Sequence, residues 1–372
     1  MISSFKVQNF RLFEDITIKK LSRVNLIVGK NNSGKSALLE ALLLYFSKMS
    51  NNDLVDLIYA RHENIGGRRG LNSRSSAFNP VRHFFKNHKT PQLFEEGFTL
   101  SSPEDSFEVK LAAYITEESA DNRFLRRFIT KEECEERGYT PEIDDVFLVV
   151  QHSDGRITRV MSINDELRDF RRRPSYLNRV SNTLVQYVPT SGLTSSKASS
   201  LWDSISLTDL EVEVVKGLQL IEPSTSGVTF VENDDGVRSL DGRIPLVKVD
   251  GVDEPIPLKS LGDGMTRIFH VILSLVCAKD GVLIVDEFEN GLHWSVQEGA
   301  WNIVFNLAKK LNVQVFTTSH SRDCVAAFEK SWKNMPEDGA FLRVYKENGY
   351  SQFKEYDLEL LSDSVDTDVE VR

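Results

Sequence analysis

Apolar residues first alternate and then run together near the start of the chain. Residues 16–18 alternate as in a half-buried strand, and 24–28 is apolar enough for a buried strand. A glycine-rich loop follows, and the pattern predicts a helix over about 34–49. Its large apolar side chains lie around much of the helix circumference, so we expect the helix to pack on two sides. They are Leu38, Leu39, Leu42, Leu43 and Phe46.

The middle of the chain is less regular. Strand-like segments at 97–115 and 146–151 are separated by about thirty charged residues, which we interpret as an exposed insertion. Residues 190–222 pass from a serine-rich loop to a helix expected at 207–220. The segment 64–94 contains six Lys or Arg and no acidic residue, and we interpret it as a mobile surface segment.

The last hundred residues alternate between helix and strand patterns. We expect a helix at about 264–278, a strand at 282–285, a helix at about 295–311 and a strand at 313–317. A short helix and final strands follow. This alternation is typical of a parallel sheet with helices packed against it.

Composition and charge exclude several classes of protein. The 372 residues are 40% hydrophobic and 27% charged, which is typical of a globular protein of one large or two small domains. The net charge of −10 excludes a protein that coats DNA or an anionic membrane by bulk attraction and leaves only local basic stretches for such contacts. The longest uncharged apolar run, 268–278, is too short to span a bilayer, and the N-terminus lacks an apolar signal segment.

The cysteines give no sign of a disulfide framework or a zinc site. Cys134, Cys277 and Cys324 stand far apart, without a CxxC spacing. They suit a reducing compartment, and we expect a cytoplasmic protein.

A phosphate-binding motif lies between the buried strand 24–28 and the helix that follows it. The loop has the form G-x-x-x-x-G-K-[ST]: Gly29, Lys30, Asn31, Asn32, Ser33, Gly34, Lys35 and Ser36. In such a loop the backbone N–H groups point at the phosphates, the lysine reaches the β and γ oxygens, and the final hydroxyl binds Mg²⁺. The strand before it and the helix after it are the context that this motif requires.

Two adjacent carboxylates follow the predicted strand 282–285. Asp286 is placed to hold Mg²⁺ through water, and Glu287 to polarise an attacking water molecule. A buried strand followed by two acids is common by itself. Together with the phosphate loop it indicates a nucleoside triphosphatase.

Two further segments have both a structural and a functional interpretation. Ser260, Gly262 and Gly264 begin a predicted helix, where they form either a plain helix cap or an anion site. His320 follows the strand 313–317, where it is either a buried cap residue or a group that reaches the γ-phosphate.

In order and content these motifs resemble the ATP-binding-cassette (ABC) type heads of the RecF, SMC and OLD (overcoming lysogenization defect) ATPases. More narrowly, they resemble bacterial OLD-like "AAA family" ATP-binding proteins found in phage-defence loci. The resemblance rests on 24–40, 258–268, 281–297 and 311–324 and is weak over about 95–250. It implies an α/β fold of the P-loop NTPase class, with a mixed or parallel sheet flanked by helices and a second, smaller α/β lobe.

The resemblance also assigns roles to residues. It implies that Lys35 and Ser36 bind phosphate and Mg²⁺, that Asp286 is the Walker-B acid, that Glu287 is the catalytic glutamate and that His320 is the switch histidine. The signature that contacts ATP on the other subunit is implied for Ser260, Gly262 and Gly264, although Leu261 departs from the LSGGQ form. Arg11 is a candidate nucleotide contact, and Gln151 and Gln186 are candidates for the Q-loop glutamine.

Two spacings narrow the choice of family. About 224 residues separate Lys35 from Ser260, too few for the coiled-coil arms of SMC proteins. After His320, 52 residues remain, too few for a Toprim nuclease domain. We therefore expect a complete single head, with lobe I at about 1–115 and 281–372 and lobe II with insertions at about 116–280. Any nuclease under its control is expected to be a separate chain.

Three functions remain open at this point. The first is an ATP-hydrolysing homodimer, closed head to tail around ATP and Mg²⁺, that switches a partner effector such as a nuclease in phage defence. The second is a RecF-like DNA clamp in repair that uses the basic stretches at 64–94 and 168–179. The third is a scaffold that binds ATP and scarcely hydrolyses it.

Overall fold

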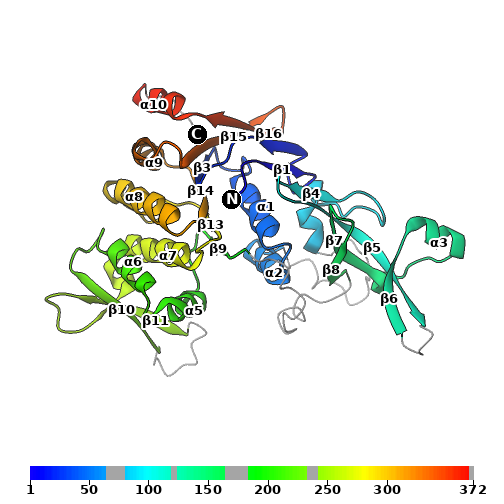
Figure 1. Ribbon diagram of the computed structural model, residues 1–372, viewed down its shortest axis with the longest axis horizontal. Helices are drawn as coiled ribbons and strands as arrows, with labels where there is room; N and C mark the ends of the chain where they lie inside the picture. Colours follow the sequence, from blue (N-terminus) through cyan, green and yellow to red (C-terminus); the bar gives the residue numbers. More distant parts are fainter. Residues whose placement is uncertain (64–79, 119–123, 164–182, 233–241, 368–372) are drawn as a thin grey trace.

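A six-stranded sheet lies at the centre of the molecule, and we describe it from a computed structural model that covers residues 1–63, 80–118, 124–163, 183–232 and 242–367 (Figure 1). The strand order is β16-β15-β3-β14-β13-β9. All neighbours pair in parallel except β16, which is antiparallel to β15. The strands are β3 (Val24–Val28), β9 (Val185–Val188), β13 (Val282–Val285), β14 (Gln314–Ser319), β15 (Gly339–Glu347) and β16 (Tyr350–Tyr356). The parallel sheet predicted from the alternating helix and strand patterns is confirmed.

Both faces of this sheet are covered, which explains the continuous apolar strands. On one face Ile27, Ile284 and Phe316 pack with the helices α1 (Lys35–Phe46) and α2 (Asn51–Ala60). On the other face Leu26 and Leu283 pack in a core with the helices α7 (Asp263–Cys277), α8 (Trp294–Lys310), α9 (Arg322–Asn334) and α10 (Leu358–Asp366).

A second, antiparallel sheet of seven strands packs against the far side of α1. Its order is β2-β1-β4-β5-β7-β8, with β6 paired to the outer half of β5. Because α1 lies between two sheets, nearly all of its side chains are buried, and the packing on two sides predicted from its sequence is confirmed. The strands are β1 (Phe5–Gln8), β2 (Asp15–Ile18), β4 (Phe98–Ser101), β5 (Ser106–Glu118), β6 (Phe124–Ile129), β7 (Val146–His152) and β8 (Ile157–Ser162).

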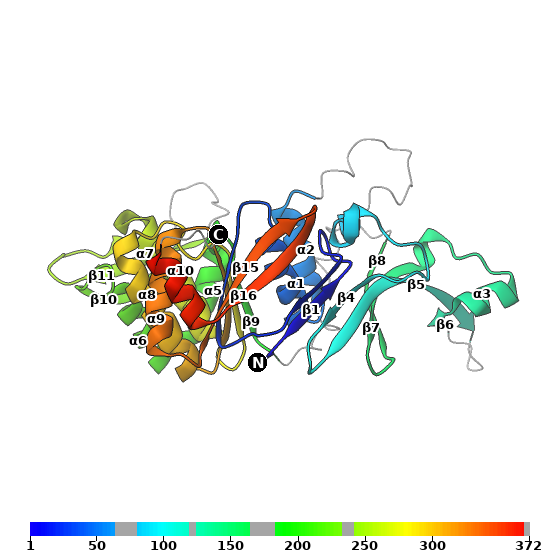
Figure 2. The same ribbon diagram turned by 90° about the horizontal axis from the view of Figure 1, so that it is seen from above.

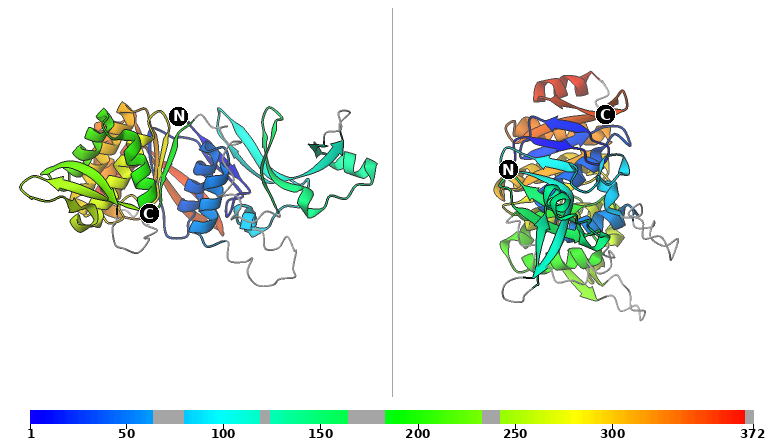
Figure 3. Two further views of the ribbon diagram at one scale, coloured as in Figure 1. Left: turned by 90° about the horizontal axis from the view of Figure 1, so that it is seen from below. Right: turned by 90° about the vertical axis from the view of Figure 1, so that its right-hand side faces the viewer.

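The two ends of the elongated molecule are different in kind (Figures 1 and 2). At one end β6 and the short helix α3 (Lys131–Arg137) project at the outer side of the seven-stranded sheet. The charged segment expected as an exposed insertion forms these two elements (Figure 3). At the other end the helices α5 (Ser195–Ile205) and α6 (Asp209–Leu218) pack on α7, next to a small sheet of β10 (Thr225–Glu232), β11 (Arg243–Val249) and β12 (Ile256–Pro257). Short 3₁₀ turns lie at Pro80–Phe84, Lys86–His88, Ile143–Asp145 and Leu258–Leu261.

The serine-rich segment after residue 190, expected as a loop, instead forms helix α5. The Thr194 hydroxyl caps the helix by accepting the Lys197 N–H at 3.3 Å. Ala198, Leu201 and Trp202 recur at helical spacing and are buried in the core that contains α7. This apolar face outweighs the weak helix preference of the serines.

The strand pairing crosses the boundaries that the sequence suggested between the two lobes. Strand β5 runs through the expected boundary at about 116, and β7 pairs with it over seven residues, so β6, β7 and β8 continue the sheet formed by the N-terminal strands. Strand β9 pairs with β13 and belongs to the central sheet. In the described part of 189–280, α5, α6 and the small sheet share a core with α7, which itself packs on the central sheet. Two basic stretches were expected from the sequence, at 64–94 and 168–179. Residues 64–79 of the first and the whole of the second lie outside the described residues.

Arg11 lies in a buried ion-pair cluster, which differs from the nucleotide contact expected for it. Its guanidinium lies 2.5 Å from Glu40 and 2.7 Å from Glu63, and its side chain is 3% exposed. Arg61 contacts the other oxygen of Glu40 at 2.5 Å. Burial raises the pKa of Glu40, and the two guanidinium groups oppose that rise. The cluster joins α1 to the chain after α2.

None of the described helices is long and apolar enough to cross a membrane.

The cluster predicts a stability effect at Arg11. Arg11→Met leaves the buried Glu40 short of one partner and should lower the free energy of unfolding by about 3 kcal/mol. The control Lys6→Met breaks the exposed pair with Asp15 and should cost less than about 1 kcal/mol. Urea unfolding at neutral pH measures both. If the two variants had equal urea midpoints of unfolding and only Arg11→Met lost ATP affinity, the result would contradict the structural role and support the nucleotide contact expected from the sequence.

Candidate active site

The phosphate loop bends sharply between β3 and α1, and two glycines make the bend possible. A Cβ on Gly29 would lie 2.3 Å from the Val344 carbonyl oxygen of β15. Gly34 has φ +117°, in the left-handed region, and precedes the first residue of α1. The backbone therefore curls between a neighbouring strand and the start of the helix, as phosphate binding requires.

Lys35 lies inside this curl. Its ammonium group donates to the carbonyl of Gly29 at 2.6 Å and to that of Lys30 at 3.2 Å. Burial lowers the pKa of Lys35, and the carboxylates of Glu287 and Asp286 oppose that effect. Ser36 follows on the first turn of α1. The Ser33 hydroxyl is buried and makes no hydrogen bond within the described residues, so the loop offers a donor to an anion.

The tandem acids begin where β13 ends, and the neighbouring strand holds them. The Thr318 hydroxyl of β14 donates to Asp286 Oδ1 at 2.6 Å and accepts the Glu287 N–H at 2.8 Å. One side chain therefore fixes both the carboxylate of Asp286 and the backbone of the next residue. Sequence reasoning missed Thr318, although polar residues at the end of a buried strand are a visible signal.

A buried arginine ties α7 to the same two acids. Arg267 donates to the carbonyl of Asp286 at 2.6 Å, to that of Glu287 at 2.7 Å and to that of Pro189 at 2.8 Å. Burial lowers its pKa, and the nearby carboxylates oppose that effect. Arg267 was also missed, and the available signal was an arginine on the buried face of an apolar helix.

His320 lies between two carboxylates. Its Nδ1 is 3.5 Å from Glu287 and 3.3 Å from Glu289, and its side chain is half exposed. Glu289 Oε1 also accepts the backbone N–H groups of His320 at 2.9 Å and Ser321 at 3.0 Å. Glu289, which sequence reasoning missed, is itself buried. It therefore anchors the turn after β14 that carries the histidine.

The predicted signature segment is exposed at the start of α7. Ser260 lies in the 3₁₀ turn Leu258–Leu261, and Gly262 has φ +99° with open space where a Cβ would be. Gly264 is close to the turn after the acids, because a Cβ on it would lie 2.9 Å from the Gly291 carbonyl oxygen. The segment thus adjoins the acidic turn and faces solvent.

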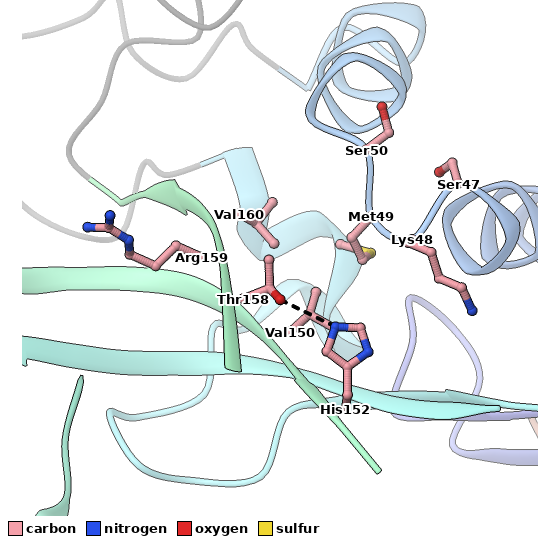
Figure 4. A pocket seen from close by; sticks show the side chains of 9 residues that line it. All are labelled: Ser47, Lys48, Met49, Ser50, Val150, His152, Thr158, Arg159 and Val160. Carbon is pink, nitrogen blue, oxygen red and sulfur yellow. Dashed lines mark hydrogen bonds between the residues drawn. The ribbon is translucent and has the colours of Figure 1, made fainter. Parts of the chain in front are cut away.

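The two candidate glutamines lie in different sheets. Gln186 is on β9, paired with Leu283 of the acid-bearing strand. Gln151 is on β7, between Val150 and His152, which line a small cavity with residues 47–50, just after the C-terminal end of α1 (Figure 4). That end of α1 is about 18 Å from the phosphate loop at the usual helical rise. Of the two, only Gln186 lies on a strand beside the acids.

Comparison with known proteins identifies the family. A family model described as "AAA domain, putative AbiEii toxin, Type IV TA system" (AAA_21) matches residues 24–323. The chain belongs to this family. The match extends from the strand before the phosphate loop to just beyond His320, so it includes the loop, the segment 260–264, the tandem acids and the histidine.

Individual relatives agree with the family. A Helicobacter pylori protein named ATP/GTP phosphatase is 22% identical over 336 residues, which are 89% of this chain and 88% of the relative. The DNA double-strand break repair Rad50 ATPase of Pyrococcus abyssi is 33% identical over 132 residues, which are 33% of this chain but only 15% of that protein.

The fold matches that of an SMC head. The solved structure of an SMC head bound to the C-winged helix domain of ScpA has a TM-score of 0.50 at 12% identity and covers 97% of this chain and 99% of that one. The fold class and the family resemblance predicted from the sequence are confirmed. The chain is an AAA_21 ATPase, and its fold is that of an SMC head.

The contacts of Glu289 predict its effect on turnover. Glu289→Gln keeps the shape of the side chain but removes the charge that holds two N–H groups and faces His320. The rate constant for ATP hydrolysis should fall at least about tenfold, with ATP affinity nearly unchanged. Steady-state turnover and equilibrium binding measure the two effects. The matched control is Glu298→Gln, at an exposed position paired with Lys330, and it should behave as the wild type. Equal rates of ATP hydrolysis in the two variants would contradict a role for Glu289 in turnover.

Proposed function

We propose that this ATPase binds Mg²⁺-ATP between two copies of the chain and uses hydrolysis to switch a partner protein. The observation that carries the proposal is the contrast between two halves of one ABC-type site. Lys35 and Asp286 are buried at the edge of the central sheet, whereas Ser260 and Gly262 are exposed just before α7. An exposed signature is available to the nucleotide of a second copy in a two-fold dimer.

The residues at the site fit a magnesium ion. Ser36 and Asp286 offer a hydroxyl and a carboxylate, the oxygen donors that Mg²⁺ prefers, and Thr318 already orients the carboxylate. Among the described residues no group of three or more His, Cys, Asp or Glu could hold a metal by itself. This suits Mg²⁺, which commonly takes its remaining ligands from phosphate and water. When bound, the ion neutralises charge on the phosphates.

Each of the chain's own groups has a task in the proposed mechanism. The loop N–H groups and Lys35 hold the phosphates, and Glu287 orients water for attack on the γ-phosphorus. His320 stands beside Glu287, so it can contact the γ-phosphate as charge develops there. Arg267 and Thr318 hold the Glu287 backbone, and Glu289 holds that of His320.

We further propose that closing and opening of the dimer acts on a separate effector, a nuclease or toxin, in defence against phage. The description of the AAA_21 family, which names an AbiEii toxin of a type IV toxin–antitoxin system, supports this setting. The DNA-clamp alternative draws support from the Rad50 relative, a DNA-repair ATPase. Salt-dependent stimulation of ATP turnover by DNA alone would favour the clamp over the effector switch.

The proposed dimer predicts how the wild type and two variants respond to ATP. Glu287→Gln should bind ATP without hydrolysing it and so accumulate as a dimer, because opening requires hydrolysis. Lys35→Ala, which lacks the phosphate ligand, should stay monomeric, and the wild type should dimerise only transiently. Light scattering with and without Mg²⁺-ATP measures the mass of each. If the molecular mass of all three proteins were the same with and without nucleotide, the proposed switch would be excluded.

A further inference from the structure

Strand β6 has one edge without a strand partner. It pairs with the outer half of β5, from Ala113 opposite Ile129 to Glu118 opposite Phe124. The inner half of β5 pairs with β4 and β7, and in the described part of the chain no strand besides β5 pairs with β6. The second edge of β6 therefore offers backbone N–H and C=O groups to another chain, as exposed edge strands do.

The outer end of β6 exposes two large apolar side chains. Phe124 is 74% exposed and Leu125 is 58% exposed. They are neighbours on a strand, so they lie on opposite faces of the hairpin that β5 and β6 form. Farther along the strand, Phe128 packs edge-on against Tyr114, and Ile129 is buried. The strand is thus anchored at one end and presents apolar side chains at the other.

The surroundings of this edge are acidic. Segments 113–118 and 124–145, which we call the distal arm, contain nine acidic and four basic residues, so the arm is negatively charged. Each of its three arginines is engaged in an ion pair within the arm; Arg126, for example, lies 3.1 Å from Asp145. Four exposed glutamates form no ion pair with any residue that the structure describes: Glu118, Glu135, Glu136 and Glu142.

The charge of the distal arm decides what can bind there. Nucleic acids and anionic lipids are repelled by it. A second copy of the chain is also disfavoured, since pairing of two β6 edges would bring two acidic surfaces together. A basic segment of another protein is attracted.

We propose that the outer edge of β6 binds an extended, basic segment of a separate protein. The segment adds a strand to the hairpin of β5 and β6, with its backbone hydrogen-bonded to β6. Its lysine or arginine side chains pair with the exposed glutamates, and its apolar side chains cover Phe124 and Leu125.

The distal arm lies at the opposite end of the molecule from α5 and α6, with the central sheet and its phosphate loop between the two ends (Figure 1). Docking on the arm therefore requires no nucleotide. The inference is independent of the proposed ATP switch, and the two are tested separately.

A peptide of alternating lysine and valine is the probe for this surface. Fluorescence anisotropy measures its binding to the full chain without nucleotide. Phe124→Ala should weaken binding about tenfold, because the bound peptide then buries less apolar surface. The double variant Glu135→Gln/Glu136→Gln should weaken binding at low salt and match the wild type at high salt. Lys35→Ala should bind the peptide as the wild type does.

Matched controls separate the ring, the charge and the strand pairing. Tyr350→Ala removes an exposed ring on β16, Glu298→Gln removes an exposed charge on α8, and both should bind the peptide as the wild type does. A glutamate–valine peptide should not bind. A lysine–valine peptide methylated at every backbone nitrogen cannot donate to β6 and should bind at least about tenfold more weakly.

Several outcomes would overturn the proposal. They are failure of the wild type to bind the lysine–valine peptide, equal affinity in Phe124→Ala, and equal affinity for the methylated peptide. A nucleotide-independent dimer in light scattering that Phe124→Ala abolishes would make a second copy the occupant instead. Tighter binding of a synthetic peptide of residues 168–179 would make the chain's own basic stretch the occupant.

Discussion

The active site depends on the burial of the parallel strands β3, β14 and β13 on both faces. Helices cover one face, and α1 with the seven-stranded sheet covers the other, so polar side chains have no room along the strands. They gather where the strands end. Because the strands are parallel, these ends lie at one edge of the sheet. The phosphate loop, the tandem acids and His320 therefore meet there, although nearly 300 residues separate Gly29 from His320.

The parts of the site that could be predicted from sequence are those encoded by neighbours in the chain. The loop 29–36 and the pair Asp286 and Glu287 are local motifs, and their structural context is visible in the strands before them. Arg267, Thr318 and Glu289 could not be predicted in this way. Each acts through a contact 19 to 32 residues away, and most of these contacts involve backbone groups, which leave no mark on the partner's sequence.

The same limit applies to the fold. The parallel sheet followed from hydrophobic patterns, whereas the division into lobes did not, because the pairing of β5 with β7 is a long-range choice of register. Helix α5 was missed because the packing of Leu201 and Trp202 on α7 outweighs local serine content. Arg11 looked like a ligand contact from its position in sequence, and only its buried partners, Glu40 and Glu63, reveal its structural role.

The central claim is that one chain supplies the phosphate loop and another the signature, and a mixing experiment tests it most directly. Lys35→Ala disables the loop, and Ser260→Arg disables the signature, so each variant alone should be inactive. In an equal mixture, half of the encounters between chains bring the intact loop of one variant to the intact signature of the other, and each such pair has one working site of two. ATPase activity should therefore return to about a quarter of the wild-type rate. A mixture that stays as inactive as its components would contradict the shared site.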